Sequence, residues 1–213
     1  MKAHVAIIQK GRMRNELVCD YTLSTEYFCS PIAKAIKGNI FIRQYRYINK
    51  KFPNSVLISK TGHIIWEDTK IHRKYQYDTS NITMDNKFIF CTILNELYVL
   101  VESTFDGKII NVVNLEKFGI KKAYYIEKTE NETYLVTSIV DKKIVEINKN
   151  SESIFEYCPG EKTMCEPRYV CISKKGNYII SDSKRHYIFE VNKAKKIRQV
   201  WGEKTIQDMR NVN

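Results

Sequence analysis

The sequence predicts an all-β fold, a β-propeller of four to five four-stranded blades with one blade incomplete or closed by the C-terminal stub. The main observation is a β-branched and aromatic phrase that recurs four times in the 213 residues. Successive copies are 47, 46 and 44 residues apart, and repeats of this length are typical of stacked blades. The aromatic positions that mark the phrase are Phe41, Phe88, Tyr134 and Tyr178.

Each repeat contains the pattern of two hairpins. In the first hairpin, an apolar run and a polar turn lead into the aromatic strand, as at Gly176-Asn177-Tyr178. In the second hairpin, apolar residues alternate on both sides of a turn, as in residues 56–58 and 64–66 around Thr61. Four short strands per repeat make one propeller blade. Helical periodicity is poor, so no helix longer than two turns is expected.

We expect one domain over residues 1–213, divided into a leading half-blade and four units. Residues 5–8 and 16–19 resemble the second hairpin of a blade without its first hairpin. Residues 209–213 stop where another first hairpin would begin. Open sheet edges invite pairing, so an incomplete ring predicts self-association or a partner. The expected units are residues 1–30 (half-blade), 31–74, 75–118, 119–165 and 166–213.

Residues 166–191 resemble an NHL repeat of the six-bladed propeller class. The family pattern has a proline, an apolar strand, a Gly-Asn turn, an aromatic strand ending in Asp-Ser, and an amphipathic strand. The family usually has an arginine where this chain has Tyr187, so the tie between that arginine and the aspartate is absent or rebuilt through Arg185. The resemblance implies a propeller fold, and binding to protein or RNA is common among such relatives. The matching residues are Pro167, Gly176, Asn177, Tyr178, Asp182, Ser183 and Ile188.

The apolar and cysteine content predicts a cytoplasmic, soluble protein without cofactor. The run at residues 5–8 is too short for a signal-peptide core, and no segment approaches a membrane span. Reduced, mostly buried thiols are therefore expected for the six cysteines. Cys158, Cys165 and Cys171 are separated by six and five residues, whereas zinc ligands are usually two to four residues apart, so no metal site is predicted.

The net charge of +11 is unevenly distributed. Residues 1–74 carry +9, residues 75–166 carry −5 and residues 167–213 carry +7. In a closed ring the two basic ends would be neighbours and form one basic side. Cations alternate with aromatic residues near residues 43–52 and 72–77, which suits phosphates and unpaired bases, although the same alternation also arises from the two faces of a strand. The candidate nucleic-acid contacts are Arg43, Tyr45, Arg46, Tyr47, Lys50, Lys51, Arg73 and Lys74.

No catalytic residue is predicted. The four histidines are scattered, and the sequence has no phosphate loop, nucleophile elbow or paired-carboxylate motif. Lys34 and Arg168 follow the prolines of their repeats, so we expect them at the mouth of the channel, where they would bind an anion.

The sequence thus favours a non-catalytic binding module that engages a protein partner, as an inhibitor or an adaptor. This hypothesis predicts that Ile206, Met209 and Val212 become covered in a complex. A nucleic-acid-binding propeller that uses the basic side is the alternative. A propeller enzyme of the lactonase or lyase kind is the third hypothesis, and it requires a cluster of acidic and histidine side chains around the channel.

Overall fold

A computed structural model describes the backbone of residues 3–10, 15–23, 27–36, 38–46, 55–59, 61, 63–68 and 70–202. Within these ranges, the side chains of residues 3–36, 43–46 and 72 are outside the description. The C-terminal stub expected to close a blade lies outside the described residues.

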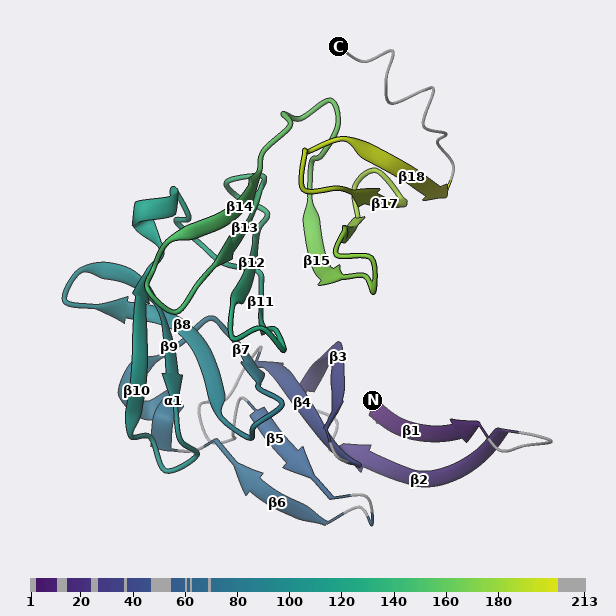
Figure 1. Cartoon of the computed structure of the whole chain (residues 1–213). Helices are drawn as coiled ribbons and strands as arrows, with labels where there is room; N and C mark the ends of the chain where they lie inside the picture. Colours follow the sequence, from purple (N-terminus) through teal and green to yellow (C-terminus); the bar gives the residue numbers. More distant parts are fainter. Residues whose placement is uncertain are drawn as a thin grey trace. The chain divides into compact units, whose positions relative to one another are not determined.

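Four antiparallel four-stranded sheets follow one another along the chain (Figure 1). In every sheet the strands pair in chain order, which is the meander of a propeller blade. The all-β prediction is therefore confirmed. The blades are β3 (Tyr27–Ile36), β4 (Asn39–Arg46), β5 (Ser55–Ile58) and β6 (Ile64–Glu67); β7 (Thr79–Ile82), β8 (Phe88–Leu94), β9 (Leu97–Ser103) and β10 (Ile109–Asn114); β11 (Tyr125–Lys128), β12 (Tyr134–Ser138), β13 (Lys143–Ile147) and β14 (Ser153–Tyr157); and β15 (Pro167–Ile172), β16 (Tyr178–Asp182), β17 (Tyr187–Val191) and β18 (Ile197–Gly202).

The chain divides into two compact units, of which the first comprises residues 1–76 and 104–108. It contains the first blade and the leading hairpin, in which β1 (Ala3–Lys10) pairs with β2 (Asn15–Leu23) as a two-stranded sheet of its own. The indole Nε1 of Trp66 donates a hydrogen bond to the Phe105 carbonyl oxygen at 3.0 Å, and the two ring centroids lie 4.8 Å apart. These contacts attach the 104–108 turn to β6.

The second unit contains the other three blades. Because successive side chains of a strand point to opposite faces, β12 contributes to two hydrophobic clusters. Tyr134 and Val136 belong to a cluster that joins the second and third blades, and Leu135 belongs to one that joins the third and fourth. Burying a large side chain in such a cluster stabilises the fold by about 1.5–3 kcal/mol, so these two interfaces hold the unit together.

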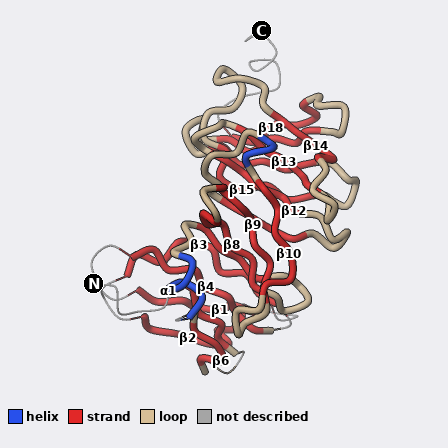
Figure 2. Tube along the Cα trace, turned by 90° about the vertical axis from the view of Figure 1, so that its left-hand side faces the viewer, coloured by secondary structure: helices blue, strands red, loops and turns tan. Residues whose placement is uncertain are grey.

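Helices are scarce, as the sequence predicted (Figure 2). The described residues contain the six-residue helix α1 (Lys70–Tyr75) and the 3₁₀ turn η1 (Glu116–Phe118). None of the helices in this part of the chain has the length and apolar character needed to span a membrane.

Candidate functional site

The blades of the second unit carry an equivalent set of six side chains on one face, which we call the outward face. Strand register defines the set, because each blade pairs the residue after the marker aromatic with a glutamate on its third strand. These glutamates recur 44 residues apart. The outward face consists of Ile89, Cys91, Leu100, Glu102, Asn111 and Val113 in the second blade; Leu135, Thr137, Ile144, Glu146, Phe155 and Tyr157 in the third; and Ile179, Ser181, Ile188, Glu190, Gln199 and Trp201 in the fourth.

The outward faces of the second and third blades are covered by the following blade. All their side chains are buried except Asn111, which is half-buried. In the third blade, Ile144 is 0% exposed and Tyr157 is 4% exposed. The Phe155 ring lies parallel to the Tyr178 ring of the next blade, with a centroid separation of 3.7 Å. These faces are therefore closed interfaces rather than free surfaces.

A tyrosine–glutamate hydrogen bond crosses each closed interface. The Tyr134 hydroxyl donates to Glu102 Oε2 at 2.5 Å, and the Tyr178 hydroxyl donates to Glu146 Oε2 at 2.5 Å. Both tyrosines are marker aromatics of the repeat. Burial, together with the neighbouring carboxylate, raises the pKa of both phenols, so each hydroxyl keeps its proton and remains a donor.

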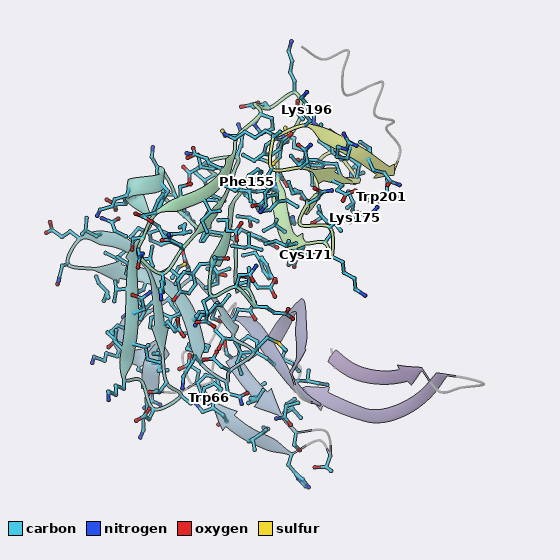
Figure 3. All side chains as sticks on the ribbon, viewed as in Figure 1. Trp66, Phe155, Cys171, Lys175, Lys196 and Trp201 are labelled. Carbon is cyan, nitrogen blue, oxygen red and sulfur yellow. The ribbon has the colours of Figure 1, made fainter. Side chains whose placement is uncertain are left out.

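The outward face of the fourth blade also combines apolar side chains with a glutamate, but no following blade covers it in the described part of the chain. Ile188 is 43% exposed and Trp201 is 40% exposed, although their equivalents in the third blade are buried. Figure 3 shows Trp201 on the side of this blade away from the third blade. Asn177 Nδ2 donates to Glu190 Oε1 at 2.8 Å, and within the described residues no tyrosine hydroxyl reaches that carboxylate. The carboxylate is thus held in place by its own blade.

A second candidate site lies around Arg168 on β15, the first strand of the fourth blade. Arg168 Nε donates to Ser183 Oγ at 2.6 Å, and its Nη1 donates to the Tyr124 hydroxyl at 2.7 Å. Its guanidinium also lies over the Tyr124 ring, 4.9 Å from the centroid, and 3.5 Å from Glu166 Oε2. Arg168 is therefore a pre-oriented, partly neutralised cation, and its anion-binding role stays a prediction.

Asp182, by contrast, has a structural role in the fourth blade. Its buried carboxylate accepts hydrogen bonds from the backbone amides of Cys165, Glu166, Lys184 and Arg185. The guanidinium of Arg185 bonds the Glu161 carbonyl instead, so Arg185 is tied to Asp182 through its backbone amide. The four amide donors hold two loops against this carboxylate. Its oxygens are therefore engaged within the protein and are not offered to a ligand.

Of the predicted nucleic-acid contacts, the structure describes the side chains of Arg73 and Lys74. Arg73 and Lys74 are exposed on α1, and Lys74 Nζ lies 5.0 Å from the centroid of the Tyr75 ring. Tyr47, Lys50 and Lys51 lie outside the described residues, as do the side chains of three other candidates. The basic side therefore stays a prediction. The three candidates described only by their backbone are Arg43, Tyr45 and Arg46, and the same holds for Lys34, the residue predicted to bind an anion at the mouth of the channel.

The cysteines are less buried than the sequence predicted. Cys91 and Cys165 are buried, whereas Cys158 and Cys171 are exposed. Cys158, Cys165 and Cys171 are free thiols. Among the described residues, no group of three or more His, Cys, Asp or Glu side chains could hold a metal ion.

The outward-face glutamates were not among the residues predicted from the sequence, although the sequence contains a signal for them. A glutamate between apolar residues on a strand ordinarily indicates a solvent-facing position, and this chain buries Glu102 and Glu146. The three glutamates are evenly spaced, and each lies 12 or 14 residues after the marker aromatic of its repeat, which would have identified them as repeat positions.

Comparison with known proteins identifies the fold. No protein-family model matches the sequence, and no curated protein matches it either. Solved structures do match: a protein of unknown function from Bacteroides caccae has a TM-score of 0.59 at 16% identity, covering 88% of this chain and 65% of that protein. Virginiamycin B lyase from Staphylococcus aureus has a TM-score of 0.51 at 14% identity, covering 78% of this chain and 53% of the lyase. Sqt1 from Saccharomyces cerevisiae has a TM-score of 0.54 at 9% identity, covering 93% of this chain and 68% of Sqt1.

The fold is therefore that of a β-propeller, and the likeness at these identities extends to the fold alone. This chain spans 65% and 53% of the length of the first two of these structures, so it corresponds to only part of each.

Proposed function

We propose that this protein is a non-catalytic binding module whose partner is another protein, with the outward face of the fourth blade as the binding surface. The observation that carries the proposal is the exposure of a face whose equivalents are buried in the two preceding blades. Exposed apolar groups around a fixed polar group are typical of protein interaction sites. An inhibitor or adaptor acts in this way, by binding without chemistry.

The covered faces indicate what the partner presents to Glu190. At both closed interfaces the incoming strand places a tyrosine hydroxyl on the glutamate. A partner strand with a tyrosine at that position would satisfy Glu190 in the same way. Residues 167–213 carry a net charge of +7, which favours an acidic partner over a second copy of this basic chain.

The scaffold of this module is proposed to be one NHL-like propeller over residues 1–213. The support is the pattern at residues 166–191 and the repetition of the tyrosine–glutamate bond at a constant sequence spacing. In this proposal the half-blade of residues 1–30 precedes the four complete units.

Site-specific photocrosslinking tests the partner proposal. A photoreactive amino acid at exposed Gln199, on the outward face, is expected to give a discrete protein adduct in a lysate. The charge reversal Glu190→Lys should abolish that adduct, because a lysine ammonium group cannot accept a hydrogen bond from the partner's hydroxyl. Glu130→Lys, in the exposed turn after β11, is the charge-matched control and should keep it. An adduct that survives Glu190→Lys, or no adduct at all, would refute this binding surface.

Nucleic-acid binding is the second candidate, and the exposure of Arg73 and Lys74 favours it. Titration of labelled single-stranded RNA and DNA across a salt series tests it. Affinity should fall with salt, with a logarithmic slope of about −0.7 per neutralised phosphate, and Arg43→Glu with Arg46→Glu should remove binding. Absence of binding at low salt would exclude this candidate.

Lyase chemistry has less support. A variant of virginiamycin B lyase in which one histidine is replaced by alanine is catalytically inactive. In this chain the four inner strands, residues 27–36, 79–82, 125–128 and 167–172, contain no histidine. The tyrosines and Arg168 of the inner strands are better suited to binding than to proton transfer at neutral pH.

A further inference from the structure

A pocket of about 400 Å³ opens at one end of the second blade, away from the surfaces described above. It lies between the β8–β9 turn and the segment that follows β10, which includes η1. This volume is within the range of about 300–1,000 Å³ that is usual for small-ligand sites. Its lining includes Ile93, Glu96, Tyr98, Glu116, Ile120 and Lys121.

The buried part of the lining is apolar. Ile120 is 0% exposed and Tyr98 is 7% exposed. The Tyr98 hydroxyl donates to Asp78 Oδ1 at 2.9 Å and accepts from the Ala123 amide at 2.9 Å. Because the hydroxyl is engaged in this way, Tyr98 offers the pocket its ring. Ile93, which is 68% exposed, adds apolar surface on the solvent side.

Hydrogen bonds from the third blade hold the segment that follows β10. Lys143 Nζ donates to the Phe118 carbonyl oxygen at the end of η1, at 2.9 Å. The Lys121 amide donates to Asp141 Oδ2, in the turn before β13, at 2.8 Å. Because this wall of the pocket is fixed before a ligand arrives, binding does not have to order it, and less affinity is lost.

Charges of both signs line the pocket without neutralising each other. Glu96 lies in the β8–β9 turn, Lys121 follows η1, and both are exposed. Within the described residues, neither side chain has a hydrogen bond or an ion pair, whether with the other or with a third residue. Glu116 adds a second carboxylate, of which Oε1 accepts from the Tyr98 amide at 3.0 Å. The pocket therefore offers acceptors for an ammonium group and a donor for a carboxylate.

We infer that this pocket binds a small apolar zwitterion, either a free amino acid or a short peptide. The ligand's ammonium group pairs with Glu96, its carboxylate pairs with Lys121, and its side chain packs against Ile93 and Ile120. A ligand with a single charge leaves one of the two charged groups without a partner, so it binds more weakly. The site is on the second blade and is separate from the surface proposed for the protein partner.

Titration of the purified full chain at pH 7, followed by the NMR signals of the ligand, tests this inference with matched probes. L-Phenylalanine carries both charges, phenethylamine lacks the carboxylate, and 3-phenylpropanoate lacks the ammonium group. The dissociation constant of L-phenylalanine should be about threefold lower than that of either single-charge probe, because each of those probes loses one ion pair. L-Leucyl-L-phenylalanine is a fourth probe: tighter binding of this dipeptide would identify a short peptide as the ligand, and weaker binding a free amino acid.

Two exposed substitutions assign the charges. Glu96→Gln should weaken L-phenylalanine and phenethylamine about threefold and leave 3-phenylpropanoate unchanged, because that probe has no ammonium group. Lys121→Gln should weaken L-phenylalanine and 3-phenylpropanoate to the same degree and leave phenethylamine unchanged. Glu130→Gln, an exposed change outside the lining, is the matched control and should alter none of the affinities.

Failure of both zwitterions to saturate the protein, or equal affinities for all the probes, would overturn the inference. The same conclusion would follow if Glu96→Gln or Lys121→Gln weakened every probe equally, because the loss would then not depend on charge. Neither Glu190 nor Gln199 takes part in these titrations. A negative result would therefore leave the crosslinking experiment to decide the proposed function separately.

Discussion

The two interfaces of the second unit use the same tyrosine–glutamate bond in different electrostatic surroundings. Between the second and third blades, Glu102 also accepts from buried Lys128 at 3.0 Å, so the bond is part of a buried ion pair. Between the third and fourth blades, Glu146 accepts instead from the Thr133 hydroxyl at 2.6 Å. One interface neutralises its carboxylate with a cation, and the other relies on hydroxyl donors alone.

The side chains next to the two tyrosines also differ, one being polar and the other apolar. Asn111 Nδ2 donates to the Tyr134 hydroxyl at 3.1 Å, whereas the equivalent Phe155 stacks on the Tyr178 ring. The hydroxyl–carboxylate pair is therefore the constant part of the interface, and the surrounding groups are exchangeable. Because this pair is constant, we propose that the Glu190 carboxylate accepts a hydrogen bond from a tyrosine hydroxyl of the partner.

The largest expected effect comes from removing the carboxylate of the ion pair. Glu102→Leu leaves Lys128 buried, with only the mostly exposed Glu132 as a partner at 2.6 Å. A buried charge that loses its partner destabilises a protein by about 3–5 kcal/mol, and the remaining pair with Glu132 places this variant near 3 kcal/mol. Chemical denaturation measures the loss of unfolding free energy.

The double variant Glu102→Leu with Lys128→Met is the control for that measurement. It removes both charges and should regain most of the lost stability, because apolar replacements of a buried pair are often neutral or better. A double variant as unstable as Glu102→Leu would show that shape, rather than charge, holds this interface together.

Removing one phenol hydroxyl should have a smaller effect, and the two interfaces should differ. Tyr178→Phe leaves Glu146 with the Thr133 hydroxyl as its one hydrogen-bond donor. The free energy of unfolding should therefore fall by about 2–3 kcal/mol, because a buried charged group loses a hydrogen bond. Tyr134→Phe should cost about 1 kcal/mol, because Lys128 still pairs with Glu102. Equal losses in parallel denaturation curves would contradict the contrast between the interfaces.

The fold was readable from the sequence because propeller strands are local. Each blade is a meander whose alternating apolar residues and polar turns lie next to one another in the chain. Tyr134 and Tyr178 are almost fully buried, and each of these two marker aromatics fills the core between two blades.

The outward-face glutamates could not be read in the same way. Their burial arises only when a later blade covers them, so neighbouring residues in the strand give no sign of it. Glu146, which lies between Val145 and Ile147, resembles a solvent-facing strand residue in sequence. The predicted basic contacts are a different case: the side chains of Arg43 and Arg46 are outside the description, so that prediction stays open.

The smallest expected effect is on the pH dependence of the unfolding free energy. It isolates the contribution of the Tyr178 hydroxyl from that of the groups around it. Burial raises the pKa of Tyr178 above the ordinary value of 10.0, and the Glu146 carboxylate raises it further. Above pH 10 the unfolded chain therefore loses this proton before the folded protein does, and stability falls as pH rises. One such tyrosine accounts for about 1 kcal/mol of unfolding free energy lost between pH 10 and pH 11. Tyr178→Phe should reduce the alkaline loss by that amount relative to the parent chain, when denaturation is measured at both pH values. Identical alkaline losses in the two chains would mean that the Tyr178 hydroxyl is not the buried donor described here.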